Sequence, residues 1–328
     1  MGRSFNLKSF RFTTLKDATR NFRPGRIDES SCGMVFKGWI DDSSCGMMFK
    51  GWIDEQTLTA SKPGMGIPIA VKFVNQEGFQ HYKKWLEKVH YSIGNLSHPN
   101  LVRLLGYCLH DDLRLLVYEF MPLRSLNKYL FERCWDYDYQ ISWGIRMKIA
   151  LGAAKALAFL HSADIIGIHW GCQNSNILVD SNYNAKLMDF GLAWDVRTGD
   201  MSNRVISGTY GYACPEYYVG TGMLTAKSDV YSFGVVLLEI LSGRRAIDVN
   251  MPCNQQNLVE WAMPYLRNKR RIFRVVDSRL DCQYSLGSAQ KAAHLAVQCL
   301  ANEAKLRPNM DVVVTALEQL QEESHMNT

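Results

Sequence analysis

The sequence predicts an α+β fold with two lobes, a small β-rich lobe followed by a larger helical one. Short apolar stretches rich in β-branched residues, typical of strands, concentrate in the first third, at 67–75 and in two runs within 101–117 separated by a turn at 110–112. From residue 141 onward the apolar residues recur with helical spacing. With 328 residues, 47% of them hydrophobic and 21% charged, the chain can bury a substantial core.

Three helices are expected. The first covers residues 79–93, after the first predicted strand. The second covers 141–162, where four residues share one apolar face: Ile145, Ile149, Leu157 and Leu160. The third begins after Thr225, whose side chain can cap a helix, and ends at Gly243. Its middle, residues 235–238, is apolar enough to be buried.

A tandem duplication lies in the predicted β-rich lobe. Residues 28–40 (DESSCGMVFKGWI) recur as residues 41–53 (DDSSCGMMFKGWI) with two conservative changes. A solenoid would need at least three copies, so we interpret the repeat as an in-frame duplication of one strand-and-turn segment. Because the copies are nearly identical, either could pair in the sheet with almost the same side chains.

The net charge of +5 is mild, and one basic run stands out at residues 267–271 (RNKRR). Such a run could bind nucleic acid or acidic lipid. No aromatic residues interleave with it, so a solvated loop between helices is the preferred interpretation.

Cysteine usage and hydropathy indicate the compartment. Nine cysteines occur singly, without a C-x-x-C pair, which predicts reduced thiols in the cytosol. No apolar run approaches the roughly 18 residues of a membrane span, and no signal peptide is evident. Gly2 hints at N-myristoylation, but Asn6 stands where that motif needs Ser or Thr. We therefore expect a soluble cytoplasmic protein.

A series of short motifs runs from Lys72 to Arg307. In order they are Val71-Lys72, His98-Pro99-Asn100-Leu101-Val102, Tyr118-Glu119-Phe120, Asn176, Asp189-Phe190-Gly191, Pro215-Glu216, Asp229-Val230-Tyr231-Ser232-Phe233-Gly234 and Arg307-Pro308. Each alone is a weak signal, but the whole series resembles the protein kinases, over nearly the entire chain. Residues 12–24 (FTTLKDATRNFRP), 96–108 and 208–217 are similar in particular to the plant receptor-like cytoplasmic kinases, in the subfamily that contains immune-signalling kinases.

This resemblance implies the bilobal protein kinase fold, with Mg-ATP in the cleft and a serine/threonine protein substrate. It divides the chain into a flanking segment (1–22), an N-lobe (23–121), a C-lobe (122–322) and a tail (323–328). The nucleotide-binding residues that it implies are Lys72, Gly33, Gly46, Glu119 and Met121. The implied metal-binding residues are Asn176 and Asp189, and the implied structural residues are Glu216, Asp229 and Arg307. Glu216 is expected to pair with Arg307, and Asp229 to anchor the catalytic loop from below.

The catalytic loop departs from the family pattern. His/Tyr-Arg-Asp-x-Lys-x-x-Asn aligns with residues 169–176 (HWGCQNSN). Gly171 therefore replaces the aspartate that accepts the proton of the substrate hydroxyl, and Gln173 replaces the lysine that steadies the phosphoryl group. A positioned general base contributes about 10² to 10⁴ in rate. No intact catalytic residue is expected at these positions.

The predicted ATP-binding parts also depart from the pattern. Lys88 stands where the family has the helix glutamate that pairs with Lys72, and Glu87 lies about 100° away around that helix. Of the three glycines of G-x-G-x-x-G, only the third remains, as Gly33 in the first copy and Gly46 in the second. Gly46 keeps the family spacing of 26 residues to the lysine, so the second copy is expected to form the hairpin.

Two functional hypotheses follow. Changes confined to the chemistry predict a pseudokinase, acting as a scaffold, decoy or allosteric partner in cytosolic, plant immune-type signalling, with ATP and Mg²⁺ bound weakly or not at all. Because Lys72, Asn176 and Asp189 persist, the alternative is a weakly active ATP-dependent serine/threonine protein kinase. A degraded paralogue without a stable role is a third possibility. The expected partners are signalling proteins such as kinases or receptors, which could recruit the chain to the inner face of the plasma membrane, without nucleic acid and without direct membrane insertion.

Overall fold

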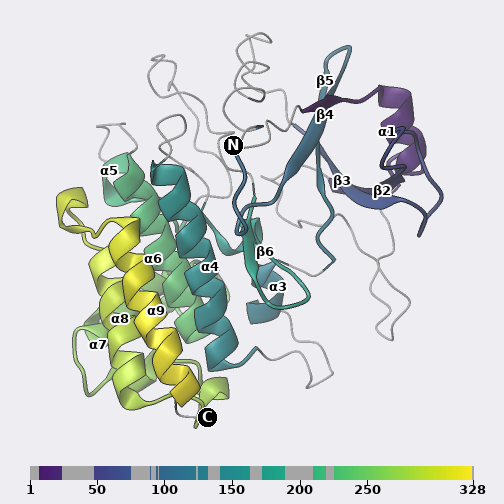
Figure 1. The fold of residues 1–328 in the computed structure, drawn as a ribbon. Coiled ribbons are helices and arrows are strands. Elements are labelled where there is room, and N and C mark those ends of the chain that lie inside the picture. The colour runs from purple at the N-terminus through teal and green to yellow at the C-terminus, as the bar shows by residue number, and fades with distance from the viewer. Residues whose placement is uncertain are drawn as a thin grey trace. The chain divides into compact units, whose positions relative to one another are not determined.

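The computed structural model describes residues 7–23, 48–74, 89, 94, 96–122, 125–131, 141–162, 172–188, 210–218 and 225–326. They fall into two compact units. The first comprises the described residues up to Ser97 together with Val102–Pro122, and the second comprises His98–Leu101 and the described residues from Leu123 onward. Figure 1 shows that the first unit is rich in strands and that the second is mainly helical. The predicted α+β class is confirmed.

The first unit is built on a five-stranded sheet in the order β1-β4-β5-β3-β2. Its strands are β1 (Lys8–Ser9), β2 (Met48–Ile53), β3 (Ile67–Phe73), β4 (Leu104–His110) and β5 (Leu113–Glu119). All neighbours pair antiparallel except β1, which runs parallel to β4. A two-residue turn with Asp111 at φ 49° joins β4 to β5, where the sequence predicted a turn.

Strand β2 comes from the second copy of the duplicated segment. Its residues pair with β3 from Met48 opposite Lys72 to Ile53 opposite Ile67. The expectation that the second copy supplies this strand is confirmed. The first copy, residues 28–40, and the start of the second, 41–47, lie outside the described residues.

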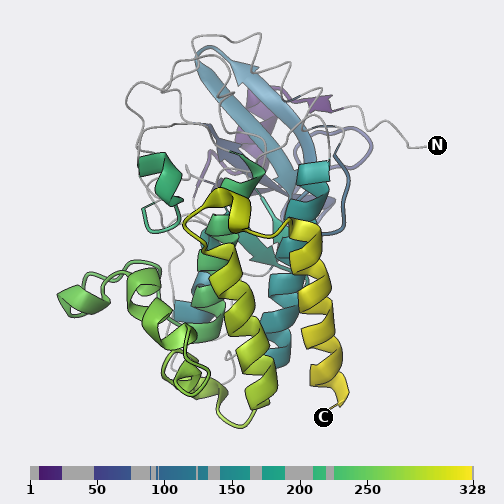
Figure 2. The ribbon, with the colours of Figure 1, turned by 90° about the vertical axis from the view of Figure 1, so that its left-hand side faces the viewer.

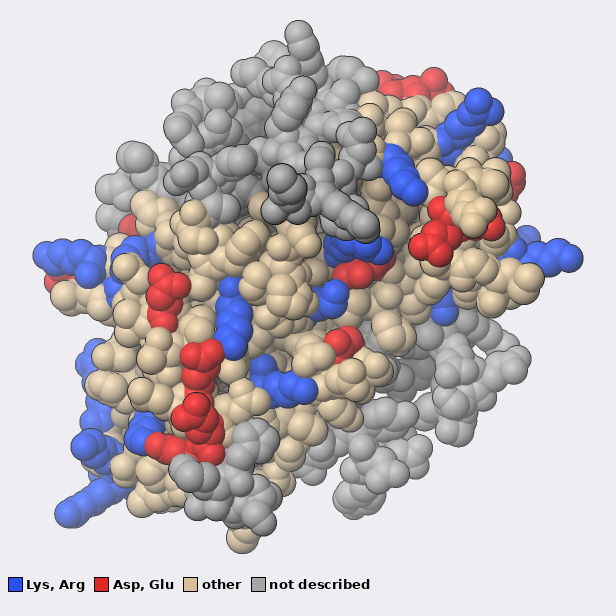
Figure 3. Space-filling view, viewed as in Figure 1, with Lys and Arg blue, Asp and Glu red and all other residues tan. Residues whose placement is uncertain are grey.

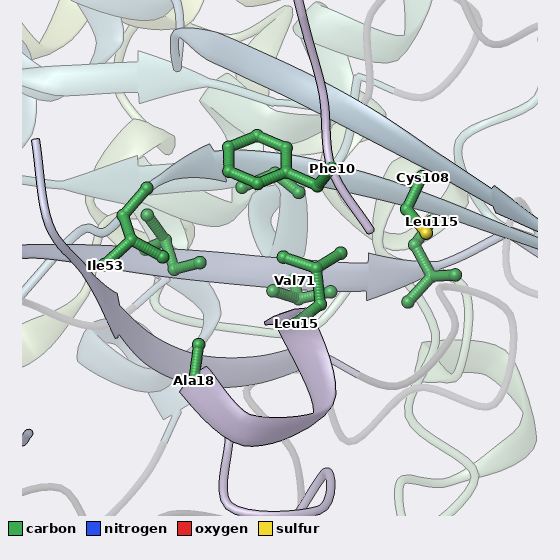
Figure 4. Close-up of a cluster of buried hydrophobic side chains, with 9 residues drawn as sticks. Phe10, Leu15, Ala18, Ile53, Val71, Cys108 and Leu115 are labelled. Carbon is green, nitrogen blue, oxygen red and sulfur yellow. The ribbon is translucent and has the colours of Figure 1, made fainter. Parts of the chain in front are cut away.

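Helix α1 (Phe12–Ala18) covers the hydrophobic core of the first unit. Phe10, Leu15 and Ala18 are buried against strand residues that include Ile53 and Val71 (Figure 4). The sequence predicted residues 1–22 as a flanking segment, and the structure places the described part, from residue 7, in the first unit. The apolar residues of this segment close one face of the sheet.

Close approach of β1 to β4 depends on Gly106. A Cβ atom at this position would lie 2.0 Å from the carbonyl oxygen of Lys8, a distance that no side chain can occupy. The Phe10 N–H then continues the pairing by donating to the Tyr107 carbonyl at 2.8 Å. Glycine is therefore required at residue 106 for β1 to join the sheet.

The second unit packs helices around one another beside a small two-stranded sheet (Figure 2). The helices are α3 (Leu126–Phe131), α4 (Trp143–Ser162), α5 (Pro215–Tyr218), α6 (Ala226–Ser242), α7 (Leu258–Leu266), α8 (Leu286–Cys299) and α9 (Met310–Met326). The strands are β6 (Ile177–Val179) and β7 (Ala185–Leu187). Short 3₁₀ turns are η3 (Asn174–Asn176), η5 (Cys253–Gln255), η6 (Ile272–Arg274), η7 (Ser278–Leu280) and η8 (Ala304–Leu306). Helix α4 packs against α9, and α6 packs against α8. The predicted helix over 79–93 lies outside the described residues, apart from residue 89.

Helix α6 begins and ends where the sequence predicts. Thr225 accepts a hydrogen bond from the Lys227 N–H at 3.2 Å, and its own N–H donates to Ser228 Oγ at 3.1 Å. At the other end Gly243 takes the left-handed conformation, φ 62°, and its N–H donates to the Glu239 carbonyl. The apolar middle, 235–238, is completely buried.

Helix α4 differs from its prediction as a helix with one apolar face. It is buried on nearly all sides, and of the four predicted face residues Ile145 is only half-buried. Arg146, a charged residue of this helix, is 1% exposed. Its guanidinium donates to Asp277 Oδ2 and to the Ile240 carbonyl, both at 2.8 Å. A buried charge that is paired in this way can occupy a core position.

Two further predictions concerned membrane-spanning segments and the state of the cysteines. Of the helices in the described stretches, none combines the length and the apolar character needed to cross a membrane. The six described cysteines, Cys108, Cys172, Cys214, Cys253, Cys282 and Cys299, are free thiols.

Candidate functional site

In the first unit, the predicted ATP-binding lysine lies on the central part of the sheet. Lys72 pairs with Met48 of β2 on one side and with Leu116 of β5 on the other. It is 7% exposed, so the sheet fixes both the backbone and much of the side chain. A lysine fixed on a strand is suited to hold a phosphate group at a defined place.

The two predicted residues at and just after the end of β5 are also fixed. Glu119 ends β5, and its Oε1 accepts a hydrogen bond from the Arg103 N–H at 3.1 Å. The Glu119 N–H donates to the Arg103 carbonyl at 3.0 Å. Met121 follows and is 3% exposed.

Several predicted site residues lie outside the described residues. They are Gly33, Gly46, Lys88, Gly171 and Asp189. Their assigned roles therefore stay predictions.

In the second unit, the predicted metal ligand Asn176 ends the η3 turn. The turn follows Gln173, which is extended at φ −142° and ψ 157°, and the Asn176 N–H donates to the Gln173 carbonyl at 3.0 Å. Both side chains are nearly buried, with Gln173 6% and Asn176 3% exposed. Gln173, which the sequence predicted to stand in place of the family lysine, is thus packed at the start of this turn.

Asn176 lies beside the chain that leads to Asp189. The Met188 N–H donates to the Asn176 carbonyl at 3.0 Å, which places the residue before Asp189 next to Asn176. A carboxamide oxygen and a carboxylate oxygen are hard ligands of the kind that Mg²⁺ prefers, so the residue types predicted at these two positions suit the ion. Among the described residues, no group of three or more His, Cys, Asp or Glu side chains could hold a metal. The neighbouring Ser175 hydroxyl is buried and has no hydrogen-bond partner within the described stretches.

A buried carboxylate that sequence reasoning missed connects this turn to the rest of the unit. Glu239 of α6 is 1% exposed. It accepts hydrogen bonds from Asn174 Nδ2 at 2.9 Å, from the Ala246 N–H at 2.7 Å and from the Tyr212 hydroxyl at 2.8 and 2.9 Å. Burial raises the pKa of Glu239 to about 8, although these donors and the Arg245 charge act to lower it.

The contacts of Glu239 join three segments far apart in the sequence. Asn174 belongs to η3, Tyr212 to the 210–218 segment and Ala246 to the chain after α6. A glutamate inside the apolar run of 235–241 was the available signal, because a buried carboxylate must find donors.

Asp229, the predicted anchor, is 2% exposed near the start of α6. Its Oδ2 lies 3.0 Å from His161 Nε2 at the end of α4. Burial raises the pKa of the Cys172 thiol, and the charges of Asp229 and Glu239 raise it further. The charge of Asp229 therefore affects the pKa of the residue that directly follows Gly171.

The predicted pair of Glu216 and Arg307 is present. Arg307 donates from Nη1 to Glu216 Oε1 at 2.6 Å and from Nη2 to Oε2 at 2.7 Å. The guanidinium also donates to the carbonyl oxygens of Ala301, Lys227 and Asn302. Burial acts to raise the pKa of Glu216, but the hydrogen bonds, chiefly those from Arg307, lower it to about 2.

A strand-rich unit that carries a buried lysine, followed by a helical unit that carries Asn176, Glu216, Asp229 and Arg307 in this order, is the arrangement expected of a protein kinase. Residues 34–317 match the family described as protein tyrosine and serine/threonine kinase. The chain belongs to this family, and the predicted kinase fold is confirmed.

Three relatives refine the family. The chain is 58% identical to Receptor-like cytoplasmic kinase 176 of Oryza sativa subsp. japonica, over 97% of this chain and 77% of the relative. It is 58% identical to Probable serine/threonine-protein kinase PBL10 of Arabidopsis thaliana, over 96% of this chain and 74% of the relative. It is 54% identical to Serine/threonine-protein kinase BIK1 of Arabidopsis thaliana, over 96% and 77%. The resemblance to plant receptor-like cytoplasmic kinases is thus confirmed. None of these relatives is named as an inactive protein, so they support the predicted alternative, a serine/threonine kinase, more than a pseudokinase.

Proposed function

We propose that this chain is a serine/threonine protein kinase of the receptor-like cytoplasmic type, which uses ATP and Mg²⁺ and transfers phosphate slowly. The observation that carries the proposal is the hydrogen bond from the Met188 N–H to the Asn176 carbonyl, because it holds the residue that precedes the predicted ligand Asp189 beside Asn176. The identity to relatives named as serine/threonine kinases supports the same activity.

The roles of the residues follow the family pattern. Lys72 would contact the α- and β-phosphates, and Glu119 and Met121 would lie beside the base of the nucleotide. Gly46, or Gly33 of the first copy, would allow the backbone to approach the phosphates.

Asn176 and Asp189 would hold Mg²⁺, which neutralises the charge of the transferring phosphoryl group.

The catalytic loop explains why transfer should be slow. Gly171 offers no carboxylate to accept the proton of the substrate hydroxyl, and Gln173 offers no positive charge to the phosphoryl group. Relative to a kinase with both groups, we expect a rate lower by about 10² to 10⁴ from the missing base alone. The positioning of nucleotide and substrate would supply the remaining rate.

A second candidate function rests on the same two residues. If Gly171 and Gln173 abolish transfer, the chain would act as a scaffold, decoy or allosteric partner of other kinases or receptors. For either function we place the chain in cytosolic signalling of the plant immune type, with recruitment to the inner face of the plasma membrane by its partners.

Radiolabel transfer from ATP by the purified chain separates the two candidates. A slow kinase incorporates label into itself or a generic substrate, and Asp189→Asn abolishes the signal. A triple variant with Gly171→Asp, Gln173→Lys and Lys88→Glu should be at least about 10² faster. The matched control replaces Gly171→Asp by Gly171→Asn, which has similar volume but no carboxylate, and should stay slow.

Label in the triple variant and none in the wild type would establish the non-catalytic candidate. A thermal-shift titration with Mg-ATP gives an independent readout, because a ligand that binds only the folded state raises its stability. The absence of any shift in the wild type would overturn the kinase proposal.

A further inference from the structure

The basic run at 267–271 lies on an exposed turn, as the sequence predicted. Helix α7 ends at Leu266, and the turn is held by Asn268, whose Oδ1 accepts from the Arg270 N–H at 3.0 Å and whose carbonyl accepts from the Arg271 N–H at 2.8 Å. Residues 267–271 are all exposed. The backbone of the turn is therefore fixed while its charged side chains face solvent.

Along the sequence, no acidic residue interrupts this basic turn. Residues 261–276 contain five cations and no Asp or Glu: Arg267, Lys269, Arg270, Arg271 and Arg274. Asp277, the next acidic residue, is 7% exposed and is occupied by Arg146 and Arg279. Figure 3 shows Lys and Arg side chains along the margin of the molecule where α7 lies in Figure 1.

An exposed aromatic ring stands next to these cations. The η6 turn has about three residues per turn, so Ile272 and Val275 point the same way, and both are 2% exposed. Phe273 and Arg274 between them must point outward, and Phe273 is 65% exposed. Burial of Ile272 and Val275 thus keeps the Phe273 ring exposed to solvent.

Two further aromatic residues lie on α7. Trp261 and Tyr265 are four residues apart on one face of the helix, with ring centroids 5.6 Å apart. The Arg244 guanidinium lies 3.9 Å from the Trp261 ring, and that of Arg274 lies 5.8 Å from the Tyr265 ring. Within the described part of the chain, cations lie over these two rings but not over Phe273.

We infer that the basic turn of residues 267–271 with Arg274 and Phe273 binds an anionic lipid surface. Lys and Arg near such a surface are attracted by its negative potential, and an exposed apolar ring beside them can enter the boundary of headgroups and acyl chains. Single-stranded nucleic acid would need open rings on which several bases stack, and Phe273 is the one uncovered ring of this surface among the described residues. The contact is peripheral, and it does not depend on phosphotransfer.

Sedimentation of the full chain with vesicles tests the inference. We expect binding to an equimolar mixture of phosphatidylcholine and phosphatidylserine, little binding to phosphatidylcholine alone, and weaker binding as salt is raised. The double variant Lys269→Glu, Arg270→Glu should bind at least about twentyfold more weakly, because each cation contributes about fivefold. The control Lys16→Glu, Lys62→Glu changes the net charge equally at two exposed positions of the first unit and should bind as the wild type.

A second pair of variants tests the ring. Phe273→Ser should weaken binding to the mixed vesicles by about tenfold, whereas Val312→Ser, which removes a side chain of similar exposure on α9, should not. Equal binding by Phe273→Ser and wild type would overturn the assignment of the apolar contact. Equal binding of both charge-reversed variants would overturn the proposal as a whole. So would binding to a polyglutamate peptide or a single-stranded oligonucleotide without binding to the mixed vesicles.

Discussion

Arg307 and Glu216 differ in exposure although they form one ion pair: the Arg307 side chain is completely buried, whereas that of Glu216 is 23% exposed. Removing the carboxylate would therefore leave a buried guanidinium without its counter-charge, which costs more than the loss of the pair itself.

We expect Glu216→Gln to lower the free energy of unfolding by about 3 kcal/mol in urea denaturation. Glu303→Gln is the matched control, because it removes the carboxylate from the pair with Lys305, whose side chains are 62% and 78% exposed. That change should cost less than about 1 kcal/mol. Similar losses in the two variants would show that burial of Arg307 does not set the cost.

Glu239 should make the stability depend on pH. Its pKa in the folded state is about 8, above the ordinary value of 4.5, so the folded state binds a proton that the unfolded state has released. The contribution of Glu239 to the free energy of unfolding is complete below pH 4.5 and is lost as the pH rises toward 8. The free energy of unfolding then falls by up to about 1.4 kcal/mol per pH unit.

Glu239→Gln should remove this slope in urea denaturation between these pH values. Tyr212→Phe takes away one donor but keeps the carboxylate, so the slope should persist in that variant. An unchanged slope in Glu239→Gln would assign the pH dependence to another group.

Gly106→Ala should detach β1 from the sheet, because the added methyl group would overlap the Lys8 carbonyl. We expect faster hydrogen exchange at the Phe10 amide and a loss of about 1–3 kcal/mol in the free energy of unfolding. Gly144→Ala on α4 is the control. Its methyl group meets nothing within 4 Å, and alanine favours a helix, so this change should be neutral or stabilising. Unchanged exchange at Phe10 would contradict the role of Gly106.

Local signals predicted much of the fold. The limits of α6 followed from Thr225 and Gly243, and the turn between β4 and β5 followed from its polar residues, because caps and turns are set by neighbouring residues. The place of residues 7–18 could not be predicted in this way. A two-residue strand has no periodicity, and its pairing depends on Gly106, almost a hundred residues later in the chain.

The site was predicted from motif order, and its distant contacts were not. Glu216 and Arg307 were matched because both belong to the family pattern. Periodicity alone could not predict the burial of Arg146, because it cannot detect Asp277, which lies 131 residues later and stabilises the charge in the core. The hydrogen bonds of Glu239 were missed for the same reason, since Asn174 and Tyr212 come from separate segments.

The register of β2 with β3 is set by residues 48–73 alone. All of these residues follow the first copy of the duplicated segment in the chain. A mutation that adds thirteen residues before this hairpin leaves every pairing of the two strands unchanged. The same insertion between Ile53 and Ile67 would instead lengthen the connection that sets the pairing. This difference offers an evolutionary reason for the position of the extra copy. Selection can tolerate a new segment before β2, because the pairing of β2 is set by the residues that follow it in the chain.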